Sequence, residues 1–284
     1  MIVREPLIND PSLWSPQIPR RTTDSNKYDF GHALIFGAEK MTGATRLAAE
    51  ACARIGAGLT TVIAKPHAAN IYRATLPPHI IVEDLHKNLS AHLKDDRRNA
   101  ILIGPGAGDD QLFMRKLIQA AIVHEKSIVL DADGLNALRK PKNLKKGNFI
   151  LTPHEGEFAR LFPKIEGEMI VRARLAARAS GAIVILKGSD TIIAAPDGQA
   201  VINQAAPVWL ATAGTGDVLS GIITGLVAQG METLWAASAA VWIHAECAKK
   251  HGPGLVANDL KDYISQILNK AFDVLIENSN AMSS

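Results

Sequence analysis

The sequence is poor in cysteine, in aromatic residues and in net charge. Its two cysteines, Cys52 and Cys247, and an aromatic content of 5% stand against a net charge of only +3 over 284 residues. Each cysteine lies in an Ala-rich stretch typical of a helix, without a second ligand at metal-binding spacing, so a buried free thiol in a reducing compartment is expected. Sparse aromatics and a low charge give no basis for nucleic-acid binding.

Long apolar runs are also missing. No run approaches the ~20 residues that a membrane-spanning helix requires. The first residues do not combine a basic start with an apolar stretch, so the sequence favours a cytoplasmic protein without a secretory leader. Hydrophobic residues make up 47% and charged residues 21%, which is ordinary for a globular domain.

Basic residues are densest at 139–146. A proline and an asparagine interrupt this segment, and Gly147 ends it. That composition favours a solvated loop, with a phosphate-binding patch as the alternative.

Short apolar runs alternate with stretches of helical periodicity along most of the chain. Because strands that alternate with helices form βαβ units, the pattern predicts a largely parallel central sheet covered by helices on both faces, a three-layer α/β/α fold. We expect an extended N-terminal arm at 1–27, one domain at 28–275 and a tail at 276–284. The predicted strands are 32–36, 59–64, 100–103, 127–130, 148–151, 182–186 and 191–195.

Ligands of parallel sheets bind at the carboxyl ends of the strands, and the unusual residues follow predicted strands. The clearest segment is Gly214-Thr215-Gly216-Asp217, directly before an apolar helix. Its backbone N–H groups and the positive end of the helix dipole predict an anion site. Asp217 either offsets that dipole or serves as a base that takes a proton from an attacking hydroxyl.

Three further segments follow strands. In Thr152-Pro-His154-Glu, capping explains Thr152 as the cap and Pro153 as the first helical residue, but it leaves His154 free for a ligand. Lys187-Gly188 suits nucleotide phosphates, although a lysine at a strand end also extends to solvent without a function. Asp131 and Asp133 either hold Mg²⁺ or cap the next helix.

The glycine-rich segment at 104–108 makes either a turn or a phosphate wrap. No Gly-Lys-Ser/Thr follows it, and it lacks the Gly-x-Gly-x-x-Gly spacing. A P-loop and a standard dinucleotide-binding fold are therefore both disfavoured.

Together these segments resemble one family. The chain is similar, from about residue 28 to about residue 268, to the ADP/ATP-dependent NAD(P)H-hydrate dehydratases of the ribokinase-like superfamily. The motifs that carry the resemblance are Gly43-Ala44, Gly56-Ala-Gly-Leu-Thr-Thr-Val62, Ile103-Gly-Pro-Gly106, Asp131-Ala-Asp-Gly-Leu-Asn136, Thr152-Pro-His-Glu-Gly-Glu157, Lys187-Gly188 and Gly214-Thr-Gly-Asp217.

The resemblance implies a reaction in which ATP or ADP phosphorylates the hydroxyl of the S epimer of hydrated NADH or NADPH, and phosphate is then eliminated. It implies that Ala44, Gly106, His154 and Asp217 meet the hydrated cofactor, with Asp217 as the base. It assigns the nucleotide to Lys187, Gly188, Ser189, Asp190, Thr191 and Gly216. The amides of Gly214, Thr215 and Gly216 would stabilise the phosphoryl charge, and Mg²⁺ would bridge the phosphates.

The resemblance also suggests a homo-tetramer, and a separate epimerase protein, because the chain has no room for the epimerase domain that some relatives carry. The alternative within the superfamily is a kinase for a vitamin-precursor alcohol, of the hydroxymethylpyrimidine or hydroxyethylthiazole type, which would stop after phosphoryl transfer. A nucleotide-binding regulatory protein without turnover is a second alternative, and Asp217 behind two glycines speaks against it.

Overall fold

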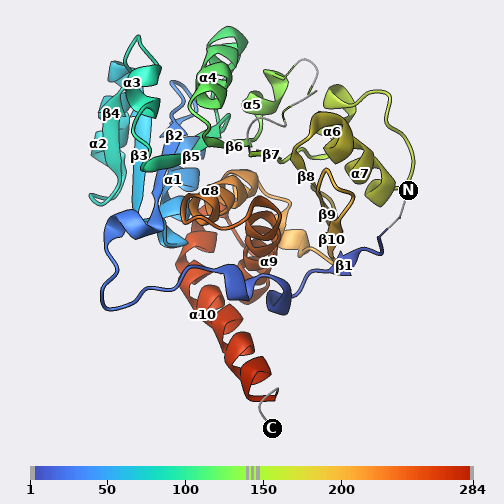
Figure 1. The fold of residues 1–284 in the computed structure, drawn as a ribbon. Coiled ribbons are helices and arrows are strands. Elements are labelled where there is room, and N and C mark those ends of the chain that lie inside the picture. The colour runs from blue at the N-terminus through green and yellow to red at the C-terminus, as the bar shows by residue number, and fades with distance from the viewer. Residues whose placement is uncertain (1–3, 139–140, 142–143, 145–147, 282–284) are drawn as a thin grey trace.

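The computed structural model describes residues 4–138, 141, 144 and 148–281, with side chains up to residue 273. The basic segment at 139–146 lies mostly outside these residues. The described part contains a ten-stranded sheet in the order β1-β10-β9-β8-β7-β6-β5-β2-β3-β4 (Figure 1). Within it, β9 runs antiparallel to β8 and β10, and the other paired strands run parallel.

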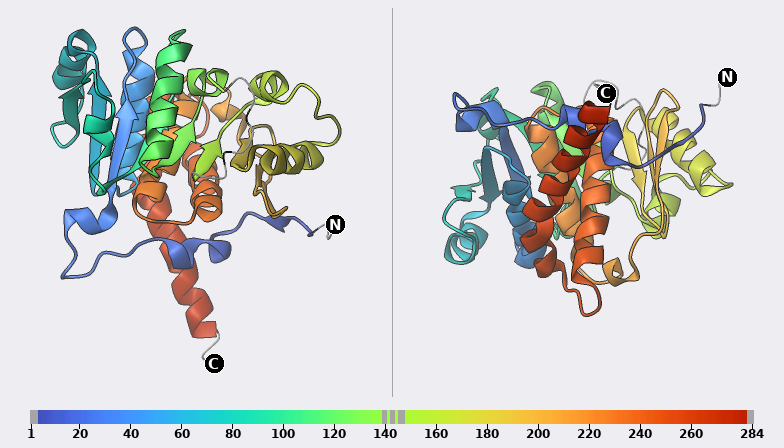
Figure 2. Two further views of the ribbon diagram at one scale, coloured as in Figure 1. Left: turned by 45° about the horizontal axis from the view of Figure 1, so that its top comes forward. Right: turned by 90° about the horizontal axis from the view of Figure 1, so that it is seen from below.

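Helices cover both faces of the sheet, as Figure 2 shows, and the predicted three-layer α/β/α architecture is confirmed. The strands are β1 (Leu7–Ile8), β2 (His32–Phe36), β3 (Leu59–Ala64), β4 (Ile81–Asp84), β5 (Arg98–Ile103), β6 (Ser127–Leu130), β7 (Phe149–Leu151), β8 (Ile183–Leu186), β9 (Thr191–Ala194) and β10 (Ala200–Asn203). The helices are α1 (Thr42–Arg54), α2 (Pro66–Thr75), α3 (Ser90–Leu93), α4 (Gln111–Val123), α5 (Asp133–Asn136), α6 (Glu155–Leu161), α7 (Met169–Ser180), α8 (Thr215–Ala228), α9 (Thr233–His251) and α10 (Ala257–Ala281).

Buried strand residues alternate between two cores because side chains point to opposite faces of a strand. On β2, Ala33 and Ile35 pack with α1, α8 and α9, whereas Leu34 and Phe36 pack on the opposite face with α4. This two-sided burial explains why the strands are uniformly apolar in sequence.

The N-terminal segment packs on its own chain. Trp14 is fully buried against Trp242 of α9, with 5.6 Å between the ring centroids. The Asn9 amide donates to the Ser238 carbonyl oxygen, and β1 extends the sheet beside β10. At the other end, α10 continues past residue 275 to Ala281 and projects from the body (Figure 1). The three-part division of the chain remains a prediction.

The sheet order reverses between β5 and β2, since the chain proceeds from β2 to β3 and β4 on one side and from β5 to β6, β7 and β8 on the other. Crevices for ligands open at such a switch point, at the carboxyl ends of the strands. The loops that begin at Gly37, Gly104, Asp131, Thr152 and Lys187 all start at this edge.

Candidate active site

Lys187 and Asp131 form an ion pair at the carboxyl edge of the sheet. Lys187 Nζ lies 3.2 Å from Asp131 Oδ1, and the Thr152 hydroxyl donates to the same oxygen over 2.7 Å. Asp131 is almost fully buried, at 3% exposure. Two donors thus satisfy this buried carboxylate, and the ion pair holds the lysine side chain at a fixed place.

The turn after β6 that carries Asp131 is strained. Ala132 adopts φ 46° and ψ −119°, a region that residues with a Cβ seldom occupy. The turn directs the two neighbouring carboxylates to different partners, since Asp133 Oδ2 accepts from the Gly108 N–H over 2.7 Å. No side chain caps α5, so the predicted capping role of Asp131 and Asp133 is not seen. Their predicted contact with Mg²⁺ stays a prediction.

Helix α8 begins directly beside this ion pair. Gly214 is its N-cap residue with φ 91°, and no side chain caps the helix. A methyl group added at Gly216 would lie 3.5 Å from Lys187 Nζ and 3.9 Å from Asp131 Oδ2. The uncapped first turn of α8 therefore lies beside the Lys187 side chain, an arrangement suited to an anion. The anion site itself stays a prediction.

Asp217 lies in this first turn and is half-buried. Burial, the largest cause, and then the negative charge of Asp131 raise the pKa of its carboxyl to about 7, although the Lys187 ammonium lowers it. A carboxylate whose pKa is close to neutrality can both accept a proton and release it at physiological pH. Asp217 therefore has the properties of a general base.

Helix α6 is capped by His154, and not by Thr152 as the sequence predicted. Its Nδ1 accepts from the Gly156 N–H over 3.0 Å, and Glu157 completes the capping box by accepting from the His154 N–H. Thr152, predicted as the cap, instead donates to Asp131. Because Nδ1 accepts, the neutral ring carries its proton on Nε2, and the side chain is 56% exposed. Capping and ligand contact are thus compatible in this residue.

A cleft of about 550 Å³ opens beside Lys187, a size within the usual range for ligand pockets. One wall carries His154, which pairs with Lys187 in an isolated parallel β-bridge, and another carries Gly216 of α8. The remaining lining residues are Gly188, Ser189, Thr191, Asn203, Ala206, Pro207, Val208, Leu210, Ala211, Thr215, Leu219, Val241, His244 and Ala245.

Asp190 is the residue of the predicted nucleotide segment 187–191 that lies outside the wall of the cleft. Its Oδ1 accepts from the Ala205 N–H over 2.9 Å, and it does not line the cleft. This contact ties the turn after β8 to the segment after β10. The carboxylate is thereby satisfied outside the cleft, where it does not oppose phosphate charge, and a direct nucleotide contact by Asp190 stays a prediction.

Ala44 and Gly106, both predicted to meet substrate, lie side by side on the other half of the edge. A methyl group added at Gly106 would lie 3.2 Å from Ala44 Cβ and 2.6 Å from the Met41 carbonyl oxygen, and Gly106 has φ 66°. Thr45 joins the two loops, since its hydroxyl donates to the Pro105 carbonyl oxygen. A methyl group added at Gly214 would lie 2.7 Å from Leu47 Cδ1, one turn along α1 from Ala44. Ala44 and Gly106 therefore adjoin the N-terminus of α8.

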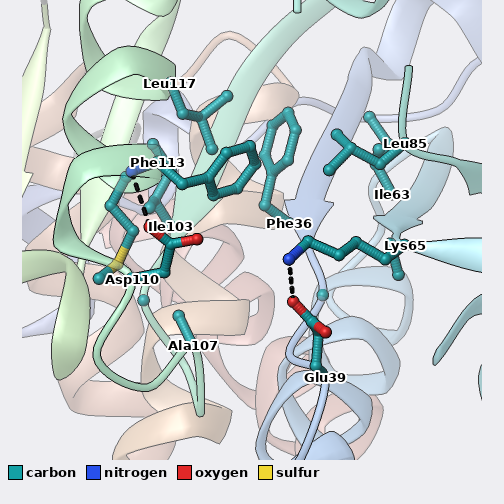
Figure 3. A pocket seen from close by; sticks show the side chains of 14 residues that line it. Phe36, Glu39, Ile63, Lys65, Leu85, Ile103, Ala107, Asp110, Phe113 and Leu117 are labelled. Carbon is teal, nitrogen blue, oxygen red and sulfur yellow. Dashed lines mark hydrogen bonds and ion pairs between the residues drawn. The ribbon is translucent and has the colours of Figure 1, made fainter. Parts of the chain in front are cut away.

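A second, small cavity lies at the switch point between β2 and β5 (Figure 3). Phe36 and Phe113 line it, and the ion pair of Lys65 with Glu39 closes one side. Its volume of about 40 Å³ holds little more than a water molecule. The cleft at Lys187 is therefore the better candidate for a bound ligand.

Across the described residues, no group of three or more His, Cys, Asp or Glu side chains could hold a metal ion. Cys52 and Cys247 are buried and free, as expected. Within the same residues, no helix combines the length and the hydropathy that a membrane crossing needs.

Comparison with known proteins identifies the family. The model of the NAD(P)H-hydrate dehydratase family matches residues 32–270. An ADP-dependent (S)-NAD(P)H-hydrate dehydratase from Neisseria meningitidis is 35% identical over 261 residues, which cover 86% of each chain. The chain belongs to the NAD(P)H-hydrate dehydratase family.

Solved structures agree with this assignment to the NAD(P)H-hydrate dehydratases. An ADP/ATP-dependent NAD(P)H-hydrate dehydratase from Bacillus subtilis, co-crystallised with ATP and Mg²⁺, superposes with a TM-score of 0.81 at 26% identity, over 93% of this chain and 98% of that one. A ribokinase-like superfamily protein from Enterococcus faecalis superposes with a TM-score of 0.82 at 24% identity, over 93% and 96%. The predicted ribokinase-like fold is thus confirmed.

The chain spans about half the length of several curated relatives. Three bifunctional NAD(P)H-hydrate repair enzymes, from Salinibacter ruber, Moorella thermoacetica and Coxiella burnetii, are 37%, 34% and 35% identical to it over 89% of its length. The matched part makes up 51%, 52% and 54% of those proteins.

Sequence reasoning missed two members of this dehydratase-family site. Thr152 is recognised only through its contact with Asp131, and His244 only through its place in the wall of the cleft. The apolar wall from 206 to 211 was also missed, although its position just before Gly214 was a usable signal.

Adding a methyl group at Gly216 tests the predicted anion site. We expect Gly216→Ala to fold with an unchanged or slightly higher Tm, since its φ is not left-handed and alanine favours helices by about 0.5–1 kcal/mol. The methyl group would stand beside Lys187 Nζ, so nucleotide affinity should fall at least tenfold. Isothermal titration with Mg²⁺–ATP and thermal unfolding measure the two effects; unchanged affinity would place the phosphates elsewhere.

Proposed function

We propose that this chain catalyses the dehydration of the S epimer of hydrated NADH or NADPH at the expense of ATP or ADP. The observation that carries the proposal is the half-buried Asp217 carboxylate, with a pKa near 7, in the first turn of α8 beside the Lys187 ammonium. The cleft and the family membership support it.

In this proposal the nucleotide lies in the cleft with its phosphates at the start of α8. The Lys187 ammonium and the backbone N–H groups of 214–217 offset the charge that develops on the transferring phosphoryl group. Ser189 and Thr191, which line the cleft, supply polar contacts to the nucleotide. Mg²⁺ would supply positive charge that offsets the charge of the phosphates, and Asp131 and Asp133 are the carboxylates predicted to meet it.

Asp217 acts as the base toward the hydrated ring. Its carboxylate takes the hydroxyl proton as the hydroxyl oxygen attacks the terminal phosphorus; the new O–P bond forms while the bond to the leaving nucleotide breaks, and the nucleotide departs with the electron pair. Ala44, Gly106 and His154 are the proposed contacts to the hydrated cofactor. His154 can donate through Nε2, since its Nδ1 already accepts from Gly156.

Elimination completes the reaction. The ring nitrogen supplies electrons as the C–O bond breaks, phosphate leaves with the bonding pair, and loss of a proton from the neighbouring carbon restores the dihydropyridine. Phosphorylation is needed because hydroxide is a poor leaving group and phosphate a good one.

Product analysis distinguishes this proposal from the kinase alternative. Purified protein with Mg²⁺–ATP and hydrated NADH is expected to release one inorganic phosphate for each NADH restored. A kinase for a vitamin-precursor alcohol would instead give a stable phosphate ester with hydroxymethylpyrimidine or hydroxyethylthiazole, and no phosphate release with the hydrated cofactor. That second pattern would overturn the dehydratase assignment.

The raised pKa of Asp217 predicts the pH dependence. Since the base must be ionised, kcat/KM should rise about tenfold per pH unit below pH 7 and level off above it. In Asp131→Asn the limb should move to lower pH, because a negative charge that raises the Asp217 pKa is removed. Asp133→Asn is the matched control: it removes a smaller contribution and leaves the Lys187 partner in place. If the limb stays at the same pH in Asp131→Asn, the pH dependence does not report the ionisation of Asp217.

The remaining sequence-based expectations extend the proposal. A homo-tetramer, a separate epimerase partner and a cytoplasmic location stay predictions. Gel filtration with light scattering measures the first of them.

A further inference from the structure

His244 lies in the middle of α9 and is buried, at 7% exposure. Its Nε2 is 2.9 Å from the carbonyl oxygen of Thr215, the first residue of α8. The side chain also lines the cleft beside Lys187. Helix α9 therefore touches the anion site through one imidazole, a contact between residues 29 positions apart.

The hydrogen bond fixes the protonation of this ring. A carbonyl oxygen only accepts, so Nε2 carries the proton and donates. Burial, the largest cause, lowers the pKa of His244 to about 4, and the Lys187 charge adds to the effect, while the bond to Thr215 opposes it. The imidazole is thus neutral at physiological pH and holds one tautomer.

The bonded carbonyl shares its peptide unit with the N–H of Gly216. The described chain has no cis peptide, and in a trans unit the C=O and N–H point in opposite directions within one plane. A bond that fixes the direction of the Thr215 carbonyl therefore fixes the direction of the Gly216 N–H. In the described part of the chain, no hydrogen bond uses this N–H, which lies in the first turn beside Lys187.

The same peptide is held from its other side. The Thr215 hydroxyl donates to the carbonyl oxygens of Leu210 and Thr212 over 2.9 and 3.1 Å. Leu210 belongs to the wall of the cleft. Thr215 is thus tied to the preceding loop by its side chain and to α9 by its carbonyl, which leaves the peptide little freedom to rotate.

We propose that His244 is a positioning residue that orients the Thr215–Gly216 peptide so that the Gly216 N–H points at the transferring phosphoryl group. The assignment rests on the proposed phosphoryl transfer, to which it adds a residue that does not itself touch the reacting atoms. A preorganised N–H donor of this kind acts mainly in the transition state.

Kinetics test the proposal through the split between kcat and KM. In His244→Phe, which fills the space without a donor, kcat should fall about 10–1000-fold while the nucleotide KM stays within about threefold. His244→Gln can place an amide N–H near the position of Nε2 and should recover most of kcat. His244→Asn is too short to reach Thr215; it should behave like the Phe variant and serves in its place if that variant does not fold.

A second readout does not depend on turnover. The chain has 22 glycines, so selective ¹⁵N-glycine labelling gives a simple amide spectrum in which the Gly216 signal is identified by its loss in Gly216→Ala. Mg²⁺–ATP should shift this signal in the wild-type protein and in His244→Gln, and much less in His244→Phe or His244→Asn.

Two results would overturn the role of His244. One is an unchanged kcat in the folded Phe or Asn variant. The other is a loss confined to nucleotide affinity, which would make His244 a simple contact of the cleft wall with the nucleobase. An equal Gly216 shift in all variants would contradict the peptide geometry. A wild-type protein without dehydratase activity would instead count against the proposed function, while the amide shifts would still decide the orientation of Gly216.

Discussion

Asp217→Asn is expected to lower kcat about 10²–10⁴-fold, because the amide has the size of the carboxylate but cannot take the hydroxyl proton. The nucleotide KM should change by no more than a few fold, since the start of α8 and Lys187 are left in place. Initial rates with hydrated NADH and Mg²⁺–ATP measure both constants. Asp262→Asn, at an exposed position of α10, is the matched control and should leave both unchanged.

The same substitution should stabilise the fold above neutral pH. In the folded protein the Asp217 pKa is raised from 3.8 to about 7, so its ionisation opposes folding, and this cost grows as the pH rises from about 4 to 7. At pH 8, Asp217→Asn should therefore increase the free energy of unfolding by about 1–3 kcal/mol. At pH 4 the two proteins should be nearly equal. Urea unfolding at both pH values measures the difference, and a loss of stability at pH 8 would contradict the raised pKa.

Lys187→Met is expected to weaken nucleotide binding about 10–100-fold, because it removes the ammonium beside Gly216. It also leaves the buried Asp131 carboxylate with Thr152 as its remaining side-chain donor, which should destabilise the protein by about 1–3 kcal/mol. Titration calorimetry with Mg²⁺–ATP and chemical unfolding measure the two losses separately.

A double variant separates the two roles of the lysine. Lys187→Met combined with Asp131→Asn removes both charges of the pair, so it should recover most of the lost stability and none of the lost affinity. Recovered nucleotide binding in the double variant would mean that Lys187 does no more than neutralise Asp131.

The sequence predicted the central sheet well because its strands are buried on both faces. Runs such as 101–103 and 183–185 are uniformly apolar, which distinguishes them from helices of ordinary amphipathic period. The strands β1 and β4 escaped prediction for physical reasons: β1 has two residues, and β4 is an edge strand that ends in Glu83 and Asp84. The break between α8 and α9 at Gly230 was missed because apolar residues at helical spacing continue on both sides of it.

The site was predictable where a local motif carries the chemistry, and less so where partners come from distant segments. Glycines before an apolar helix indicated the anion site, and the structure places Lys187 beside it. The contacts of Asp131 come from Thr152 and Lys187, distant residues that the sheet brings beside it. The capping role of His154 was missed because the cap was assumed to lie two residues earlier, at Thr152. Its ligand contact stays a prediction.

Absorbance of the reduced nicotinamide tests the central claim most directly. Purified protein is mixed with the S epimer of hydrated NADH and Mg²⁺, with ATP, with ADP or without nucleotide. We predict growth of the reduced-nicotinamide band that requires nucleotide and is lost in Asp217→Asn. A flat trace with both nucleotides, from protein shown to be folded, would contradict the dehydratase account.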